Sequence, residues 1–332
     1  MKYPVLVTGG AGCIGIQVCR ELVRQGMTVH LLDLGEQISR VHSAIPEGVK
    51  IFYGSVLDVS SIREAMMGCK SVVHLAAMLG VRRTESNRLR CLEVNIQGTK
   101  RVLDCAIQHR IEKFVFASSS EVYGEPLENP ITEEAITQGK TVYAISKLAG
   151  EELCKGYAQQ YAMFSPVILR IFNTFGPYQA AQFAIPRFIM NALSGISLTI
   201  NGSGKQTRSY SYSSDTARGI VQGLVRDLPK DEIVNLGNDA KPISLEQLAQ
   251  TILSVVERPD LEIRYARNFA DTDRTEEREI YHRYCSGEKA RKLLGFVPTI
   301  SLEEGIAQVA ESNSIFDKWE SSEQIYYDDE LT

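Results

Sequence analysis

Tyr143 and Lys147 are the two residues whose types and spacing point most directly to chemistry. A tyrosine and a lysine four residues apart lie on one face of a helix. The ammonium group of a lysine favours a nearby phenolate, so Lys147 is expected to lower the pKa of Tyr143. A tyrosine tuned in this way can act as a base near neutral pH. The pair therefore predicts oxidation of an alcohol, provided that a hydride acceptor is also bound.

Hydroxyl and carboxyl groups stand upstream of this pair in the run SSSEVYG, residues 118–124. The serine hydroxyls can hold a substrate alcohol in front of Tyr143. Glu121, inside the run, can move protons at a neighbouring carbon atom. A structural interpretation competes with this one, because Glu121 could simply be a carboxylate that accepts backbone hydrogen bonds.

The run GGAGCIG at residues 9–15 predicts where the hydride acceptor binds. Gly9, Gly12 and Gly15 lie between a predicted strand and a predicted helix. In such a loop one glycine permits the tight turn, one lets the backbone approach a pyrophosphate and one allows close helix packing. Asp33 follows the second predicted strand, where a carboxylate accepts hydrogen bonds from ribose hydroxyls and repels a 2′-phosphate. NAD is therefore favoured over NADP.

Short apolar runs alternate with helical patterns through the first half of the chain, which predicts a parallel sheet covered by helices on both faces. After about residue 173 the pattern becomes less regular and mixes short strands with helices. Strands are predicted at 5–7, 29–32, 49–53, 71–75, 114–117, 167–170, 198–200 and 233–235, and helices at 14–25, 58–67, 92–109, 143–161, 185–194, 214–228 and 244–256.

The composition is that of a soluble globular protein. The chain has 332 residues, of which 44% are hydrophobic, and a formal net charge of −5, which argues against a nucleic-acid surface. No apolar run approaches the ~18 residues needed to span a membrane, and the first residues do not resemble a signal peptide. Seven cysteines, none in a metal-type pair, are expected to be reduced thiols in a cytoplasmic protein without a metal site.

One basic cluster departs from this acidic balance, and it comprises Arg82, Arg83, Arg88 and Arg90. Such a cluster is typical of a solvated helix or loop face. It could instead form a rim that attracts the phosphate or carboxylate of a substrate. The sequence leaves both interpretations open.

The glycine loop, the SSSEVYG run and the Tyr143–Lys147 pair together resemble the extended short-chain dehydrogenase/reductase family, and within it the nucleotide-sugar epimerases, dehydratases and decarboxylases. The resemblance runs from about Val5 to Ile306. It implies an α/β fold, with a Rossmann-type doubly wound parallel sheet and a smaller mixed α/β substrate-binding lobe. The matching motifs are GGAGCIG (9–15), HLAA (74–77), VNIQGT (94–99), SSSEVYG (118–124), YAISK (143–147), RIFNTFGP (170–177), GSGKQTRSYSY (202–212) and KARKLLGFVP (289–298).

The resemblance also implies a division of the chain. The NAD-binding domain is expected to take residues 1–173, with returning segments from about 205–240. The lobe that binds the nucleotide-diphosphate sugar would take about 174–204 and 241–315. Residues 316–332 form an acidic tail.

Each matching residue acquires an implied role. Tyr143 would remove the proton of the sugar C4 hydroxyl while hydride passes from C4 to NAD, and Ser119 would hydrogen-bond the C4 oxygen. Lys147 would bind the nicotinamide ribose. Asn173 would contact the sugar or the phosphates, and two arginines would clamp the diphosphate. The residues so implied for the cofactor are Gly9, Gly12, Cys13, Ile14, Gly15, Asp33, Ser55, Val56, Leu75, Ala76, Ala77, Asn95, Tyr143 and Lys147, and those for the substrate are Met78, Arg82, Asn173, Arg208 and Arg283.

Two positions depart from the family pattern. Ser55 replaces the aspartate that usually contacts adenine, so that contact is expected to be weaker or to come from backbone groups. Cys13 replaces a larger apolar or aromatic residue and is expected to be a small packing residue.

Three reactions are open once C4 has been oxidised: 4-epimerisation, 4,6-dehydration and loss of a C6 carboxylate. In this family dehydratases and decarboxylases carry a glutamate where Glu121 stands, whereas simple 4-epimerases usually carry a small residue. Ser119-Ser120-Glu121 therefore favours the dehydratase and decarboxylase types, with Glu121 as the base. Ser120 stands in place of a second acid, which weakens the case for dehydration. A 4-epimerase is the alternative.

A non-catalytic dinucleotide-binding regulator is the hypothesis from another class. Regulators of that kind typically lose the tyrosine or the lysine, and this chain keeps both. The resemblance further implies a homodimer, formed through the helices predicted at 92–109 and 143–161.

Overall fold

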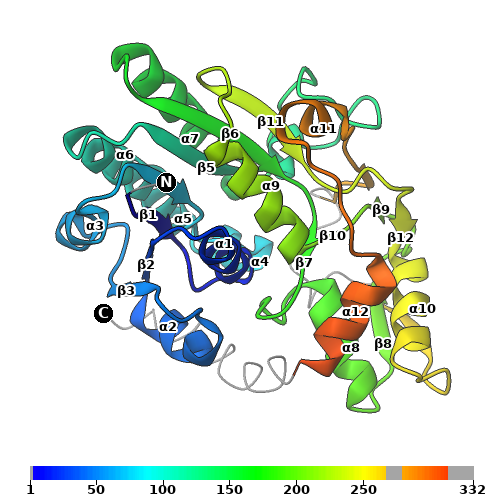
Figure 1. Cartoon of the computed structure of the whole chain (residues 1–332). Helices are drawn as coiled ribbons and strands as arrows, with labels where there is room; N and C mark the ends of the chain where they lie inside the picture. The colour runs from blue at the N-terminus through cyan, green and yellow to red at the C-terminus, as the bar shows by residue number, and fades with distance from the viewer. Residues whose placement is uncertain (1–2, 267–278, 313–332) are drawn as a thin grey trace.

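A seven-stranded sheet forms the centre of the protein. The computed structural model describes residues 3–266 and 279–312. The seven strands are β1 (Val5–Thr8), β2 (Val29–Asp33), β3 (Lys50–Tyr53), β4 (Ser71–His74), β5 (Lys113–Ser119), β6 (Ser165–Ile171) and β11 (Glu232–Leu236). They lie in the order β11-β6-β5-β4-β1-β2-β3, and every neighbouring pair is parallel (Figure 1). This is the doubly wound order with one strand added beside β6, so the predicted Rossmann-type sheet is confirmed.

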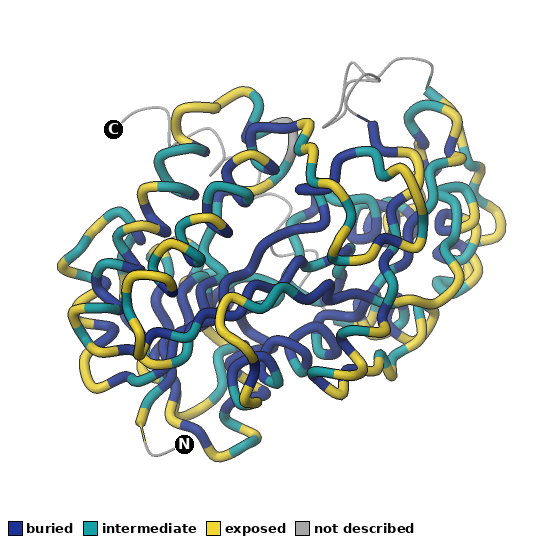
Figure 2. Tube along the Cα trace, turned by 90° about the horizontal axis from the view of Figure 1, so that it is seen from above, coloured by how far each residue is buried: buried dark blue, intermediate teal, exposed yellow. Residues whose placement is uncertain are grey.

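The central strands are short and apolar because helices cover both of their faces. All four residues of β1 and of β4 are buried, and Figure 2 shows the buried strands between helices whose outer sides are exposed. One face packs against α1 (Cys13–Arg24), α2 (Gly35–Val41), α9 (Ser213–Val225) and α11 (Glu288–Leu294). The other face packs against α3 (Val59–Met66), α6 (Thr99–Gln108) and α7 (Val142–Gln160).

The strand order reverses between β1 and β4: β2 and β3 follow on one side of β1, and β4, β5 and β6 follow on the other. Ligands of doubly wound sheets bind at this switch point, beyond the carboxyl ends of the strands. The glycine loop follows β1, and Met78 comes shortly after β4. The fold therefore brings segments that are distant in sequence to one edge of the sheet.

A second hydrophobic core lies outside the sheet. It is formed largely by α8 (Ala184–Leu193), α10 (Leu245–Val255), α12 (Leu302–Glu311) and β8 (Leu198–Asn201). The chain enters this part, returns to the sheet through α9 and β11, and leaves again. The predicted division of the chain stays a prediction, and α11, which lies inside the range predicted for the lobe, packs against the sheet. The short strands are β7 (Thr174–Phe175), β9 (Thr207–Arg208), β10 (Ser211–Tyr212), β12 (Ile243–Ser244), β13 (Ile263–Ala266) and β14 (His282–Arg283).

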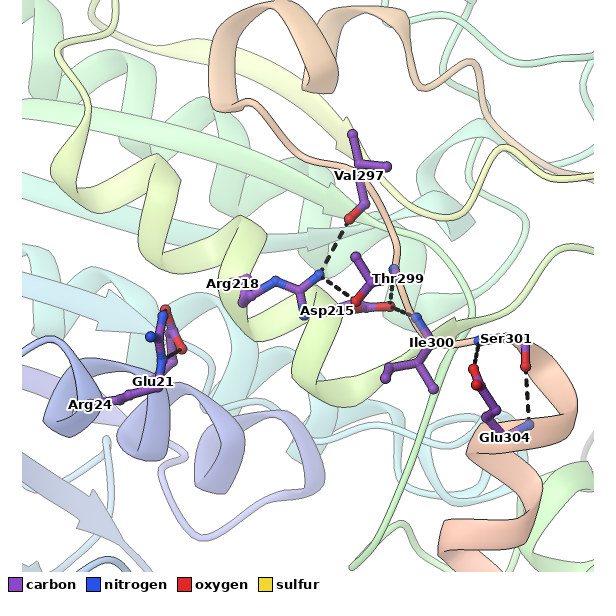
Figure 3. A network of polar contacts seen from close by, with 9 residues as sticks. All are labelled: Glu21, Arg24, Asp215, Arg218, Val297, Thr299, Ile300, Ser301 and Glu304. Atoms are coloured by element: carbon purple, nitrogen blue, oxygen red, sulfur yellow. Dashed lines mark hydrogen bonds and ion pairs between the residues drawn. The ribbon is translucent and has the colours of Figure 1, made fainter.

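Asp215, in the first turn of α9, ties the two parts together (Figure 3). Its carboxylate is fully buried and accepts hydrogen bonds from the backbone N–H of Thr299 at 2.9 Å and of Ile300 at 3.0 Å. It also pairs with Arg218 at 2.5 Å. A buried carboxylate with this many donors is well compensated. The segment that leads into α12 is thereby fixed to a helix of the sheet domain.

The one long helix predicted over 92–109 is wrong in detail. The structure has α5 (Arg88–Leu92), a π-helix (Glu93–Gly98) and then α6. A π-turn shifts the residues that follow it around the helix axis, and such turns are frequent at functional sites. Gly98 lies in this turn so close to Val56 that a Cβ atom would be 2.8 Å from a methyl group of that valine.

Several elements carried no clear signal in the sequence, among them α2, α11, α12 and α4 (Val81–Ser86). A turn of 3₁₀-helix at His42–Ala44 and another at Ser120–Tyr123 were also not predicted. All seven cysteines are free thiols, as predicted. Among the described residues no helix could cross a membrane, and no three metal-ligating side chains come together.

Candidate active site

The Tyr143–Lys147 pair lies at the start of helix α7, as its spacing predicts. The helix begins after Thr141, whose hydroxyl oxygen accepts a hydrogen bond from the N–H of Ala144 at 3.1 Å. Tyr143 is therefore in the first turn, and Lys147 is one turn further on. The Lys147 ammonium nitrogen lies 5.7 Å from the centroid of the Tyr143 ring.

A buried ion pair fixes α7 to the sheet. Glu151, on α7, accepts hydrogen bonds from Arg170 of β6 at 2.9 and 2.7 Å and from Ser118 of β5 at 2.5 Å. Both charged side chains are buried, so each compensates the charge of the other. Helix α7 is thereby held against the carboxyl ends of β5 and β6, where the SSSEVYG run begins.

Ser119 and Tyr143 meet directly, as the implied roles require. The hydroxyl of Tyr143 is hydrogen-bonded to Ser119, the last residue of β5. The Ser119 oxygen also accepts a hydrogen bond from the N–H of Glu121 at 3.2 Å. Ser120 is buried at the start of the 3₁₀ turn. A substrate alcohol that reaches Tyr143 would thus meet two hydroxyl groups.

The pKa of Tyr143 is raised, which corrects the expectation that Lys147 lowers it. Burial of the phenol is the largest cause, and the negative charge of Glu121 is the next. The Lys147 ammonium donates instead to the carbonyl oxygen of Ala117 at 2.8 Å and lies over the ring of Phe116. Burial lowers the pKa of Lys147 itself to about 8. Helical spacing could place the two groups on one face, but it could not reveal the competing carbonyl.

Glu121, Thr141 and Arg283 form a group that we call the Glu121 cluster. One carboxylate oxygen of Glu121 lies 3.4 Å from a guanidinium nitrogen of Arg283, and the other accepts a hydrogen bond from the Thr141 hydroxyl at 3.3 Å. The charged side chains are 11% and 4% exposed, so water screens them little. The positive charge of Arg283 also acts on Tyr143. The resemblance implied a diphosphate contact for Arg283, whereas its guanidinium lies beside the Glu121 carboxylate.

The glycine loop has the shape that a dinucleotide requires. Gly9 has a positive φ of 71°, and a Cβ atom on it would lie 2.6 Å from the backbone nitrogen of Ala76. A Cβ atom on Gly15 would lie 2.2 Å from the carbonyl oxygen of Gly9. At Gly12 it would meet only that same oxygen, at 3.3 Å. Gly12 is also the N-cap of α1, with no side chain in the capping position. The helix N-terminus can therefore be approached by a pyrophosphate.

Asp33 ends β2, and Ser55 follows the end of β3. The carboxylate of Asp33 accepts hydrogen bonds from the N–H groups of Ala11 and Leu34 at 2.9 and 2.8 Å. Burial raises the pKa of Asp33 to about 6. The Ser55 hydroxyl accepts a hydrogen bond from the N–H of Leu57 at 3.1 Å, within its own turn. The expectation that backbone groups contact adenine here stays a prediction.

Asn95 is engaged inside the protein. Its side chain accepts a hydrogen bond from the N–H of Met78 at 2.7 Å, and it donates to the carbonyl oxygen of Met78 at 3.0 Å and to the hydroxyl of Ser146 at 2.9 Å. Asn95 and Met78 are both buried. Asn95 thus links the segment after β4 to the helix of Tyr143, and its implied contact with the cofactor is untested.

Two of the residues implied for the substrate, Arg208 of β9 and Arg283 of β14, are register partners on adjacent parallel strands. Four N–H groups of Arg208 are directed to Glu279 and to the carbonyl oxygens of Thr207, Ile280 and Tyr281. Its predicted diphosphate contact would have to compete with these bonds.

The Asn173 side-chain oxygen is buried without a hydrogen-bond partner among the described residues, which leaves it available to a ligand. Arg82 lies on α4, but its side chain is outside the described part of the structure. The exposed side chains of Arg88 and Arg90 pair with Glu85 of α4 and with Glu93 of the π-helix, as on a solvated face.

A sequence model described as the NAD dependent epimerase/dehydratase family matches residues 5–237, more than half of the chain. The chain belongs to this family. NAD is its cofactor, and the glycine loop and Asp33 fit the pyrophosphate and a ribose of NAD as described above.

Named relatives within the family differ in reaction. The chain is 34% identical over 324 residues to a UDP-N-acetyl-alpha-D-glucosaminuronate decarboxylase of Bacillus cytotoxicus. The aligned region covers 93% of this chain and 97% of that relative. The chain is 28% identical over 327 residues to a dTDP-glucose 4,6-dehydratase of Streptomyces niveus, covering 92% and 91%. The crystal structure of a UDP-glucuronic acid 4-epimerase from Bacillus cereus, in complex with UDP-glucuronic acid and NAD, is 26% identical and has a TM-score of 0.83, covering 93% and 98%.

Two groups that hold the start of the Tyr143 helix were not predicted from the sequence. Thr141 caps α7, and a carboxylate oxygen of Glu85 accepts a hydrogen bond from the N–H of Val142 at 3.0 Å. A threonine just before a predicted helix is a recognised N-cap signal, so Thr141 could have been found. Glu85 lies on α4, far away in sequence, and no local pattern indicates its contact.

Proposed function

We propose that this chain is an NAD-dependent decarboxylase of a nucleotide-linked uronic acid and acts through a 4-keto intermediate. The observation that carries the proposal is the buried Glu121–Arg283 pair beside Tyr143 and Ser119. Oxidation at C4 needs only the tyrosine, the serine and the cofactor. The additional carboxylate and guanidinium supply chemistry beyond C4, and a guanidinium is the side chain best suited to hold a substrate carboxylate.

The first step oxidises the C4 hydroxyl. Ser119 holds the C4 oxygen, and Tyr143 takes the hydroxyl proton as its O–H bond breaks. Bound NAD would supply the acceptor and later the donor of the C4 hydride, and the positive charge of its oxidised nicotinamide ring would favour the Tyr143 phenolate. That charge acts against the burial and the Glu121 charge that raise the pKa of Tyr143 in the protein alone.

The second step breaks the bond between C5 and C6. A 4-keto uronate is a β-keto acid, so the electron pair of this bond can move onto the C4 carbonyl while C6 leaves as carbon dioxide. A proton then replaces C6 on C5, hydride returns to C4 and Tyr143 returns its proton to the C4 oxygen. The net change is uptake of one proton and release of one carbon dioxide, without net oxidation.

Arg283 and Glu121 have different roles in this second step. The 3.4 Å separation of the two groups is longer than a charge-assisted hydrogen bond of about 2.8 Å. The guanidinium can therefore also hold the C6 carboxylate beside C5. Glu121 lies beside the guanidinium, its charge acts on Tyr143, and it can carry the solvent proton to C5. The decarboxylase from Bacillus cytotoxicus, at 34% identity, supports the same reaction.

Two other reactions of the family are less well supported. A 4,6-dehydration needs an acid for the departing C6 hydroxyl, and Ser120 offers a hydroxyl where a carboxyl would be required. A 4-epimerisation needs the 4-keto sugar to turn over and take the hydride on its other face. That reaction is the second candidate, because the similar epimerase structure from Bacillus cereus also holds a uronic acid nucleotide.

A panel of nucleotide sugars tests the proposal. The NAD-loaded protein is incubated separately with UDP-glucuronic acid, UDP-N-acetylglucosaminuronic acid, UDP-glucose and dTDP-glucose, and the products are weighed by mass spectrometry. The proposal expects loss of carbon dioxide from a uronic acid nucleotide. Loss of water from a neutral sugar would assign a dehydratase, and a C4-inverted product of unchanged mass would assign a 4-epimerase.

A further inference from the structure

We propose that Thr141 is a positioning residue that sets Glu121 for the second step of the reaction. This inference rests on the proposed function, because it assigns Thr141 to the step after C4 oxidation. Thr141 is the N-cap of α7 and is 4% exposed, so its hydroxyl contacts protein groups rather than bulk water. Its side chain hydrogen-bonds the start of α7 to the Glu121 carboxylate.

The hydroxyl group of Thr141 both accepts and donates a hydrogen bond. Its oxygen accepts the hydrogen bond from the N–H of Ala144 at 3.1 Å, which is an ordinary N-cap contact. A hydroxyl carries one proton, and this proton is directed to the Glu121 carboxylate at 3.3 Å. An N-cap residue without a donor would satisfy the helix and leave Glu121 unheld on this side.

The backbone reinforces this connection. The N–H of Gln138 donates to the carbonyl oxygen of Val122 at 2.9 Å, so the segment before α7 runs along the turn that carries Glu121. Gly124, at a positive φ of 62°, allows the approach, since a Cβ atom there would lie 2.4 Å from the Gln138 carbonyl oxygen. The backbone places Thr141 next to Glu121, and the hydroxyl then fixes the orientation of the carboxylate.

Thr141 therefore has two separable functions: it caps the helix of Tyr143, and it orients the Glu121 carboxylate. Tyr143 stands two residues after Thr141 and is held by the helix, by Ser119 and by the Glu151 anchor. The Glu121 carboxylate, in contrast, contacts Arg283 and the hydroxyl of Thr141. Removal of the Thr141 proton donor should therefore leave C4 oxidation largely intact and slow the step at C5.

Three variants separate capping from the contact with Glu121. Thr141→Ser keeps the cap and the donor. Thr141→Asp keeps a good cap but has no proton to donate and adds a like charge beside Glu121. Thr141→Val loses both. Ser301→Ala is the matched control, because Ser301 is the N-cap of the remote helix α12.

The measurement uses the full-length, NAD-loaded protein with UDP-glucuronic acid and UDP-N-acetylglucosaminuronic acid. NADH absorbance reports C4 oxidation, and released carbon dioxide reports the step at C5. We expect Thr141→Ser to match the wild type. Thr141→Asp and Thr141→Val should each lower the ratio of carbon dioxide release to C4 oxidation by about 10- to 100-fold, the usual effect of a misplaced catalytic group. Ser301→Ala should lower the unfolding temperature without changing this ratio.

The outcomes distinguish the two proposals. If the wild type releases no carbon dioxide from either nucleotide, the proposed decarboxylation fails before any variant is compared. If the wild type decarboxylates and Thr141→Asp keeps the wild-type ratio, Thr141 is only a helix cap and the positioning role is overturned. Equal slowing of both steps in Thr141→Asp would also overturn it, because that result places the effect on Tyr143.

Discussion

The glycine loop and the Glu121 cluster are assembled in different ways. The loop is one continuous segment, residues 9–15, and its geometry is set by backbone atoms and by missing side chains. The Glu121 cluster joins three side chains from the turn after β5, the start of α7 and β14. The loop accommodates a cofactor that serves every reaction of the family. The cluster contains the side chains that can act beyond C4, so the difference between reactions should lie there.

Glu121→Gln should give the largest effect, because it removes the proton carrier but keeps the size of the side chain. Product formation should fall by about 10²–10⁴-fold, the usual contribution of a general acid or base. NADH should still form transiently, because Ser119 and Tyr143 are unchanged. Stopped-flow absorbance combined with product analysis measures both quantities. Full turnover in this variant would show that the cluster does not act after C4 oxidation.

Arg283→Met should have the next largest effect, and the effect should depend on the substrate. A guanidinium that holds the C6 carboxylate contributes nothing to a neutral sugar. We expect kcat/KM for the uronic acid nucleotide to fall by about 10²-fold or more, on the scale of a lost charged hydrogen bond in a buried site. Binding of the matching neutral nucleotide sugar, measured by calorimetry, should change far less. An equal loss for both ligands would support the diphosphate contact that the resemblance implied.

Two glycines of the loop allow a matched comparison. Gly15→Ala places a Cβ atom 2.2 Å from the Gly9 carbonyl oxygen, so the loop must shift and the protein should lose about 1–3 kcal/mol of stability. Gly12→Ala meets the same oxygen at 3.3 Å and should keep its stability to within about 1 kcal/mol. It should nevertheless bind NAD at least about 10-fold more weakly, because the methyl group occupies the approach to α1. Denaturation and NAD titration of the two variants measure this contrast, and unchanged NAD affinity in Gly12→Ala would contradict it.

Lys147→Met should change the stability of the protein in a way that depends on pH. Burial lowers the pKa of Lys147 from 10.5 to about 8 in the folded protein, so the charged form is disfavoured there. Below pH 8 the wild type carries this cost, and its stability rises with pH between about 8 and 10.5. The methionine variant avoids the cost but loses the hydrogen bond to Ala117. It should be about 1–2 kcal/mol more stable near pH 7 and lose that advantage above about pH 10.

Chemical denaturation across this pH range measures the Lys147→Met prediction. A variant that is less stable than the wild type at pH 7 would show that the hydrogen bond to Ala117 outweighs the burial of the charge. Loss of activity in the same variant is expected from the predicted contact of Lys147 with the nicotinamide ribose.

The sequence predicted the sheet and the cofactor region well because their determinants are local. Buried parallel strands read as continuous apolar runs, and a dinucleotide loop needs glycines at fixed positions. All seven strands of the sheet and the helix of Tyr143 were placed within a few residues. The π-helix at Glu93–Gly98 was not predicted, because its cause is tertiary packing around Asn95 and Gly98.

The candidate site was predictable only in part. Tyr143, Ser119 and Glu121 were identified and are found together. The direction of the pKa shift of Tyr143 was predicted wrongly, because this pKa depends on burial and on Glu121 rather than on helical spacing alone. The position of Arg283 beside Glu121 depends on how β14 pairs with β9, a contact between segments that no periodicity relates.

The reaction run in deuterated water with a uronic acid nucleotide tests the central claim most directly. If Glu121 and Arg283 direct a decarboxylation, the product lacks the carboxyl group and carries one solvent deuterium at C5, which NMR and mass spectrometry together reveal. A product that retains the carboxyl group and is inverted at C4, with no deuterium at C5, would contradict the account and assign the chain to 4-epimerisation.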